Sequence, residues 1–475
     1  MPVARNSGDE IISTPLLVGE REEDQEQSAA NDQLNLEAGD KYSLPLNRNN
    51  HQERIQGDNS KTAHQINEDS WVHAATVLIT CNNSAYILSY SESIMVHLGW
   101  TGGVVGLFVA TALSLYASTL PAKLHQLGGR RHIRYRDLAG YIYGKKGYNI
   151  LWLLQYLNLF MASTGFIILA GSAIQGVCTL FMDDKALKIS YCNLIAGLTF
   201  FIFAIMVPHL SALASWLRIS AFLTAIYVFV TLALCIRDGI KAPTRDYNIP
   251  GTQVGLIFMT IGSISSLFVP LNAGMIPEIQ ATLKAPVVEN MMKALYAQFT
   301  VGVIPIYAVI LIGYWAYGSG TSSYLLNNAS GPIWAKALAN IAAFLQSIIN
   351  FHIMACPSYE YFDTKYEVKG GALAPKALSF RIKIRGSYLI VSSLVAAILP
   401  FIGDFIGLIG SICVVPLTFV IPNHMYLTIK KNLNSVQKLW HWFNVIIFSI
   451  LSVAATVASV RLIVIDSKNY KIFGD

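Results

Sequence analysis

Two apolar stretches of the sequence carry polar and helix-breaking residues that can build a binding site. The first is the run Thr-Cys-Asn-Asn-Ser at 80–84, in the middle of the apolar segment 71–90. The second is 268–278, which contains Pro270, Asn272, Gly274 and Pro277. Proline and glycine remove backbone hydrogen bonds and expose carbonyl and N–H groups. Exposed backbone is tolerated in a bilayer only inside protein or beside a cavity, so the pattern predicts two unwound segments that face a cavity.

The exposed ends of such broken helices attract a substrate carboxylate, because the N-terminus of a helix carries a partial positive charge. The backbone N–H groups around Ser84 are expected to hold it. The predicted substrate-binding residues are Asn82, Asn83, Ser84 and Ala85 on the first segment, facing Asn272, Ala273 and Gly274 on the second. Tyr156, Asn158 and Phe160 could line the same site, although aromatic residues at this spacing are also typical of a packed core. A plain proline kink is the alternative for 268–278.

Ionisable residues inside apolar segments are expensive and are therefore functional candidates. Glu92, Glu278 and Arg218 are candidates for proton coupling. Three interpretations of Glu92 stay open: a hydrated residue in the outer headgroup region, a proton-coupling carboxylate, or an obstruction of the outer gate. Arg218 could extend its charge to the membrane surface or occupy an internal cation position. Glu360 and Asp363 are expected to pair with Lys365.

The composition excludes several classes of protein. Of 475 residues, 53% are hydrophobic and 13% are charged, whereas about 25% are charged in a typical soluble domain. A soluble enzyme, a disordered protein and a nucleic-acid-binding module are therefore excluded, and a polytopic membrane protein remains. The sequence has no G-x-S-x-G, H-E-x-x-H or Walker A motif. It is therefore not expected to be an enzyme or to bind a metal or cofactor, and transport would use an ion gradient.

The apolar runs predict an all-α membrane protein with about eleven spans. They cover 71–90, 102–124, 150–181, 191–207, 212–236, 254–282, 295–317, 333–361, 388–402, 405–427 and 439–465. The fourth and fifth runs nearly touch, so ten spans are also possible. The two interrupted segments are spans one and six. That spacing indicates an inverted five-plus-five repeat whose paired broken helices form a site at the bilayer midplane.

The ends of the chain differ from its middle. Half of the acidic residues, 14 of 28, lie in the first 70 positions. The sequence predicts a disordered acidic cytoplasmic tail over 1–63, a transmembrane domain over 64–466 and a short C-terminal tail over 467–475. The loops around 130–136 and 381–385 are rich in arginine and lysine, which places them and the N-terminus in the cytoplasm. Asn328 begins an Asn-Ala-Ser glycosylation motif, which this topology places outside the cell.

Three stretches of the sequence are distinctive: Gly-Arg-Arg-His-Ile-Arg-Tyr-Arg-Asp at 129–137, Gly-Met-Ile-Pro-Glu-Ile-Gln at 274–280 and Gln-Lys-Leu-Trp-His-Trp at 437–442. They resemble plant proline transporters of the amino acid/auxin permease family. The resemblance covers about 62–473 and implies a LeuT-like fold, proton-coupled import and small substrates such as proline, GABA and betaines. Cys81, Ser89 and Glu92 replace three glycines of the family pattern, so the substrate is left open.

The resulting hypothesis is a plasma-membrane symporter that imports a small amino acid or compatible solute (proline, GABA or glycine betaine) with protons. Its partners would be the substrate, protons and the lipid bilayer, with no nucleic acid, and no oligomeric state is predicted. The alternative is a non-transporting amino-acid sensor with a transporter fold that signals through its acidic tail.

Overall fold

The computed structural model describes residues 69–182, 187–206, 213–241, 244–272, 274–366, 375–468 and 470. Their regular structure is helical, apart from one isolated bridge that pairs Asp69 with Leu283. The predicted acidic tail lies outside these residues. So does the junction between the fourth and fifth apolar runs, at 207–212.

The longer helices follow one another with short connections. They are α3 (Trp71–Asn82), α4 (His97–Leu124), α5 (Tyr135–Phe181), α6 (Ile189–Met206), α7 (Leu213–Lys241), α8 (Gln253–Ser266), α9 (Ile276–Ala281), α10 (Val287–Ala297), α11 (Ile304–Tyr317), α12 (Ile333–Lys365), α13 (Pro375–Ile398), α14 (Ile402–Ile409), α15 (Ile421–Ile429) and α16 (Ser435–Lys468).

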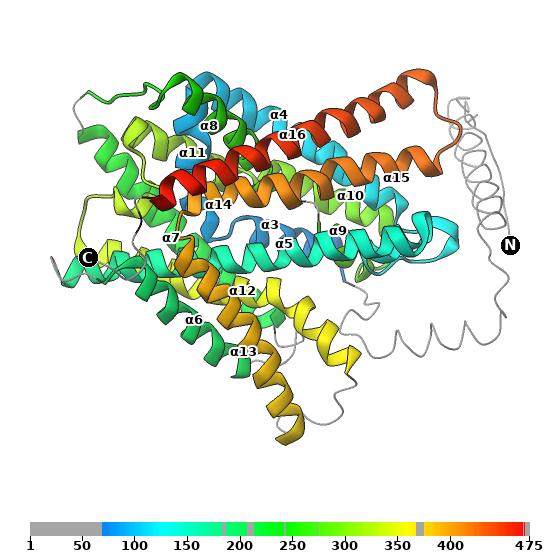
Figure 1. Ribbon diagram of the computed structural model, residues 1–475, viewed down its shortest axis with the longest axis horizontal. Coiled ribbons are helices and arrows are strands. Elements are labelled where there is room, and N and C mark those ends of the chain that lie inside the picture. Colours follow the sequence, from blue (N-terminus) through cyan, green and yellow to red (C-terminus); the bar gives the residue numbers. More distant parts are fainter. Residues whose placement is uncertain are drawn as a thin grey trace, which may run out of the picture.

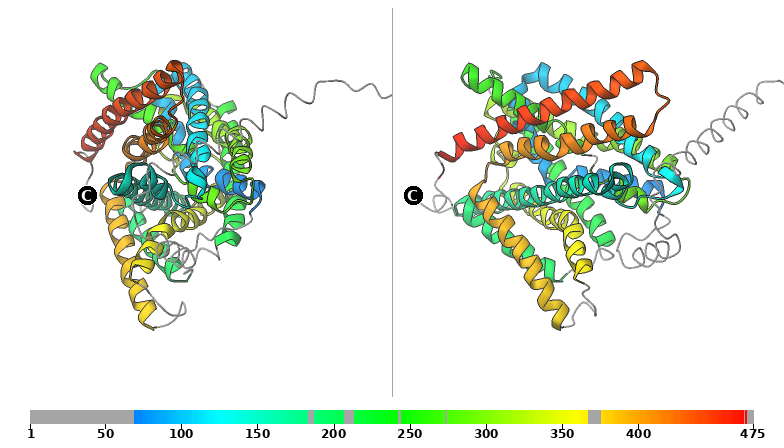
Figure 2. Two further views of the ribbon diagram at one scale, coloured as in Figure 1. Left: turned by 90° about the vertical axis from the view of Figure 1, so that its right-hand side faces the viewer. Right: turned by 45° about the vertical axis from the view of Figure 1, so that its right-hand side comes forward.

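Helix α5 runs lengthwise through the middle of the molecule (Figure 1). Helices α4, α8 and α14 to α16 lie on one side of it, and α6, α12 and α13 lie on the other; the right-hand view of Figure 2 shows the same division. Helix α5 packs on α12 and α6, while α16 packs on α8 and α14. The two groups of helices therefore lie on opposite sides of α5, and the short α3 packs on α10 and α7.

Nine helical stretches of the described residues are long and apolar enough to cross a membrane. They include the continuous stretch from residue 402 to residue 429, which contains α14 and α15. Neither α3 nor α13 is among the nine, so the count of eleven spans stays a prediction. The all-helical membrane architecture is confirmed.

The first predicted interruption is present. Helix α3 ends at Asn82, and Ser84 has an extended backbone with φ −78° and ψ 175°. One 3₁₀ turn, η1 (Ala85–Leu88), and one π-helical turn, η2 (Ser91–Val96), then lead into α4. The backbone turns within the start of α4 at Gly99, whose φ of 65° favours glycine. The chain therefore stays helical beyond residue 90, where the sequence predicted the end of the span.

The second interruption falls at the proline-rich cluster. Helix α8 ends at Ser266, a 3₁₀ turn η6 (Val269–Leu271) follows, and Asn272 is extended with φ −64° and ψ 127°. Helix α9 then begins with Pro277 in its first turn, a position where the missing N–H costs nothing. Both broken segments are thus set by local sequence chemistry.

The loop after α4 provides a pH-dependent contribution to stability. His125 is fully buried, and neither of its ring nitrogens has a partner among the described residues. Burial, and then the nearby His132 and Arg131, lower the pKa of His125 from 6.5 to about 4. The folded chain therefore binds fewer protons than the unfolded chain between these two pH values, and acidification favours unfolding.

We accordingly expect the free energy of unfolding of the detergent-solubilised protein to fall by about 1 kcal/mol per pH unit between pH 6.5 and 4. His125→Phe should remove this part of the slope, because the ring that must stay neutral is gone. Thermal unfolding at several pH values measures the effect. An identical slope in both proteins would show that His125 does not contribute.

Candidate functional site

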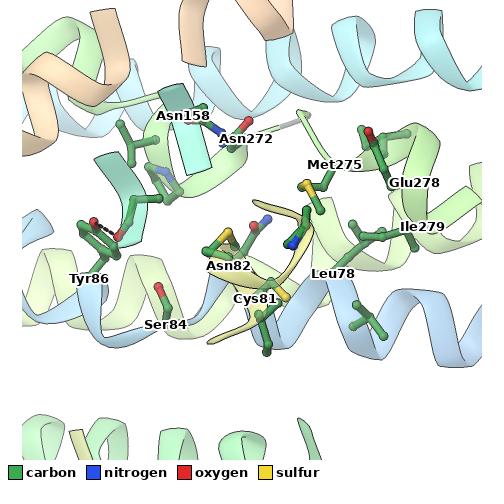
Figure 3. Close-up of a pocket in the computed structure, with 18 of the residues that line it drawn as sticks. Leu78, Cys81, Asn82, Ser84, Tyr86, Asn158, Asn272, Met275, Glu278 and Ile279 are labelled. Carbon is green, nitrogen blue, oxygen red and sulfur yellow. Dashed lines mark hydrogen bonds between the residues drawn. The ribbon is translucent and has the colours of Figure 1, made fainter. Parts of the chain in front are cut away.

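A cavity of about 270 Å³ lies between the two interruptions. Its walls come from α3, α5, α12 and the segment that joins α8 to α9. Figure 3 shows Cys81, Asn82 and Ser84 on one side and Asn158 and Asn272 on the other. Two chain segments about 190 positions apart therefore meet across one cavity, as the matching breaks predict.

The residues of the first break divide between the cavity and the surrounding helices. Asn82 and Ser84 line the cavity. Asn83 does not: its Nδ2 donates to the carbonyl oxygens of Ile79 at 2.9 Å and Gly302 at 2.8 Å. The buried Ala85 is not among the lining residues either. Two of the four residues predicted on this segment thus face the cavity, and the other two fix the break to its neighbours.

A buried glutamine on α12 holds the break in place. The Ala85 N–H donates to Oε1 of Gln346 at 3.1 Å, and Gln346 is fully buried. The hydroxyl of Tyr227 on α7 donates to the carbonyl oxygen of Asn83 at 2.9 Å. Of the N–H groups around Ser84 that were expected to hold a carboxylate, that of Ala85 is already bonded to a protein side chain.

The second break presents Asn272 to the cavity. Oδ1 of Asn272 accepts the Gly274 N–H at 2.8 Å, which closes a tight turn. A Cβ atom on Gly274 would lie 3.1 Å from that oxygen and 3.7 Å from Nδ2 of Asn158. The absence of a side chain at Gly274 therefore lets α5 approach the break. The predicted Ala273 lies outside the described residues.

Helix α5 lines the cavity with Asn158, Ala162 and Phe166. Tyr156 and Phe160, also predicted to line it, do not. Residues two positions apart on a helix point about 200° apart, so both rings lie on the face of α5 opposite Asn158. They contact Tyr361 of α12 and Tyr388 of α13, respectively. The aromatic stripe is packing, and the polar residue between its members is what reaches the cavity.

Glu278 occupies one end of the cavity. Its Oε1 accepts the backbone N–H of Tyr135 at 3.2 Å and Nε2 of Gln155 at 2.8 Å. Gln155 also donates to the carbonyl oxygen of Gly274 at 3.1 Å. The Glu278 carboxylate therefore joins α9 to the first residue of α5, and Gln155 joins α5 to the break before α9. Glu278 also lines a second, much smaller void of about 30 Å³, together with Arg136 and Tyr156.

The other two proton-coupling candidates lie away from the cavity. The Glu92 carboxylate rests against Gly403 and interacts with Asp404 and Asp466. Arg218 is exposed on α7. An exposed position fits an arginine that reaches the membrane surface and does not fit an internal cation position. Of the three candidates, Glu278 alone lines the cavity.

Two further sequence expectations concern residues outside the cavity. Asp363 contacts Arg381 at 3.6 Å and Arg385 at 3.9 Å, so its partners come from α13, and the predicted pairing with Lys365 is wrong. Lys365 instead lies over the ring of Tyr361.

Asn328 makes two side-chain hydrogen bonds, accepting from the Ser322 N–H and donating to the Gly320 carbonyl oxygen.

Several residues at the site were not predicted. Gln346 and Asn350 lie one helical turn apart on the buried face of α12, and this recurrence of amides inside an apolar span is the signal that could have identified them. Tyr86, Tyr90 and Phe166 close one end of the cavity. Aromatic residues in an apolar run resemble ordinary core, so nothing in their pattern marks them.

Comparison with known proteins identifies the family. The model of the family "Transmembrane amino acid transporter protein" matches residues 67–463. Relatives in Arabidopsis thaliana include GABA transporter 1, 28% identical over 86% of this chain and 93% of that protein. Lysine histidine transporter-like 6 is 24% identical over 91% of this chain and 99% of that protein. Amino acid permease 2 is 24% identical over 84% of this chain and 89% of that protein.

The family match spans both interrupted segments and every helix that lines the cavity. The match agrees with two predictions from the sequence: that the protein is built from membrane-spanning helices, and that it is a transporter and not an enzyme. The chain belongs to the transmembrane amino acid transporter family.

Proposed function

We propose that this protein imports a small amino acid across the plasma membrane together with protons, and that the substrate binds in the cavity between the two broken helices. The observation that carries the proposal is the shared cavity, with Ser84 and Asn82 on one break and Asn272 on the other. Relatives named for GABA, for lysine and histidine and for amino acids support this substrate class. Proline, GABA and glycine betaine are the compounds to test first.

The cavity fits a small zwitterion. Among the described residues, those that line it include no lysine or arginine, and their histidine, His73, lies near the start of α3. A substrate carboxylate at the two breaks therefore meets no lysine or arginine. The donors at the two breaks are hydroxyl, amide and backbone N–H groups, as in other discontinuous-helix sites. A volume of about 270 Å³ leaves room for a compact solute.

The proposed orientation places the N-terminus in the cytoplasm and Asn328 outside. The cavity extends along α3 to His73 and Asp69, near the start of the helix. His73 is exposed. In this orientation the described conformation presents its substrate site to the cytoplasm, which is the state that releases an imported solute.

Glu278 is our candidate for the proton-coupling group. An ionised carboxylate makes charge-assisted hydrogen bonds, which are roughly twice as strong as neutral ones. Protonation of Glu278 would therefore weaken its bonds to the Tyr135 N–H and to Gln155. Because these bonds join α5 to α9, a proton at this position would change how firmly the two helices are held together at that end of the cavity.

We expect Glu278→Gln to flatten the pH dependence of uptake, because an amide keeps the size of the side chain but does not titrate. Occupancy of a titrating site changes by up to about tenfold per pH unit, so the wild type should respond strongly to external acidification and the variant should vary less than about twofold. Initial rates of uptake across a pH series measure this.

Glu92→Gln is the matched control, since Glu92 lies away from the cavity. It should leave the pH profile of uptake unchanged. If the pH profile of uptake is flat in Glu92→Gln and normal in Glu278→Gln, Glu92 is the proton-coupling residue and Glu278 is not. An increase in uptake in Glu92→Gly would instead support the interpretation of Glu92 as an obstruction.

A further inference from the structure

Asn158 is a buried polar residue without a complete set of partners. It is 4% exposed, lines the cavity, and its Oδ1 accepts no hydrogen bond from the described part of the chain. A buried acceptor without a donor is costly. A half-turn of the carboxamide would exchange Oδ1 with Nδ2 and present the oxygen to the cavity. A ligand that brings an N–H group can therefore satisfy it.

The position of Asn158 matches one end of a zwitterion. It lies beside Asn272. Both Oδ1 of Asn272 and Nδ2 of Asn158 are within 4 Å of the position that a Cβ atom on Gly274 would take. Figure 3 shows the two amides together on the side of the pocket that faces away from Ser84. A substrate whose carboxylate binds at the break near Ser84 would direct its ammonium group across the cavity toward Asn158.

We infer that Asn158 recognises the substrate ammonium group through its N–H bonds, so that the site selects primary and secondary amines over quaternary ones. This inference rests on the proposed function, because it deepens the description of the same site. A betaine carries no N–H and would leave Oδ1 unpaired. The predicted order of binding therefore places proline and GABA above glycine betaine.

The aromatic residues of the cavity do not offer an alternative site for a quaternary ammonium group. Such groups bind to open aromatic faces. Tyr86 packs edge-on against Phe166, with ring centroids 4.9 Å apart, and stacks toward Tyr90 at 6.4 Å. This packing of the three rings on one another limits the aromatic face that each of them presents to the cavity.

The experiment measures binding at the cavity directly. Cys81 lines the cavity, and its modification by N-ethylmaleimide in the full-length protein can be quantified by peptide mass spectrometry. Proline, GABA and glycine betaine are then compared as protectants. We expect proline or GABA to protect wild-type Cys81 at concentrations at least about tenfold below those of glycine betaine, since rejection of a ligand that leaves a polar group unpaired is worth this much or more.

Asn158→Leu, which keeps the approximate size of the side chain, should reduce this preference to within about threefold by weakening the amino acids alone. Phe160→Leu, on the opposite face of α5, should leave the preference unchanged. The inference is overturned if wild-type protein binds glycine betaine as well as proline and GABA, or if Asn158→Leu weakens all three equally. If Asn158→Leu does not fold, Asn158→Asp decides: it must keep the preference for N–H-bearing ligands.

Failure of the inference and failure of the proposed function are separable in this design. Protection of Cys81 reports binding even when no solute crosses the membrane. A protein that binds in the predicted order without uptake would refute import and leave the role of Asn158 intact. Uptake in which glycine betaine is preferred would support import and refute the role of Asn158.

Discussion

Gly274→Val should lower the apparent affinity for the transported amino acid about 10- to 100-fold while the protein still reaches the membrane. The added Cβ would lie 3.1 Å from Oδ1 of Asn272, and the branched methyl groups would extend toward Asn158. Overpacking of this kind costs about 1–3 kcal/mol, and each 1.4 kcal/mol changes affinity about tenfold. The backbone of Gly274 is not left-handed, so the effect comes from crowding. Concentration-dependent uptake measures it.

Two control variants accompany Gly274→Val: a smaller substitution at the same position, and the same substitution at a position with open space. Gly274→Ala should give a smaller loss, because the Asn272 side chain need shift by only a few tenths of an ångström. Gly320→Val should have no effect, since nothing lies within 4 Å of an added Cβ there. Normal affinity in Gly274→Val would show that the second break does not contact the substrate.

Gln346→Leu should be the second damaging change. It leaves the N–H of Ala85 buried without an acceptor, which costs about 1–3 kcal/mol. Because Ala85 follows directly on Ser84, the penalty displaces the segment that faces the substrate. We expect apparent affinity to fall about 5- to 100-fold by the same conversion, with protein still present at the cell surface.

Gln253→Leu is the matched control for Gln346→Leu. Gln253 is exposed at the start of α8, so its replacement should leave affinity unchanged. Equal behaviour of the two variants would mean that the hydrogen bond from Ala85 does not position the break. Substrate saturation curves and surface labelling, measured on the same cells, distinguish loss of affinity from loss of protein.

Local chemistry made the two breaks predictable. Pro270 and Pro277 cannot continue a regular helical ladder, and Asn82 to Ser84 form a polar run that a lipid-facing helix cannot accommodate. Both signals are contained within about ten residues of sequence, so no knowledge of distant contacts was needed. The helices α3 and α9 end and begin at these positions.

The inward or outward direction of single side chains was less predictable. Asn158 faces the cavity while Tyr156 and Phe160 do not, because the phase of a helix inside a bundle depends on all of its neighbours. The bond between Ala85 and Gln346 joins positions 261 residues apart. The contact of Glu92 with Gly403 is similarly remote in sequence. Such contacts are set by how helices pack, which composition and periodicity do not encode.

The most direct test of the account is uptake of labelled proline and GABA by the purified full-length protein in proteoliposomes with an acidic exterior. We predict accumulation above the equilibrium level, collapse of that accumulation when a protonophore removes the pH gradient, and strong impairment in Gly274→Val. Absence of uptake for every amino acid tested, in protein whose Cys81 is still protected by those amino acids, would contradict transport and favour the alternative of a non-transporting amino-acid sensor.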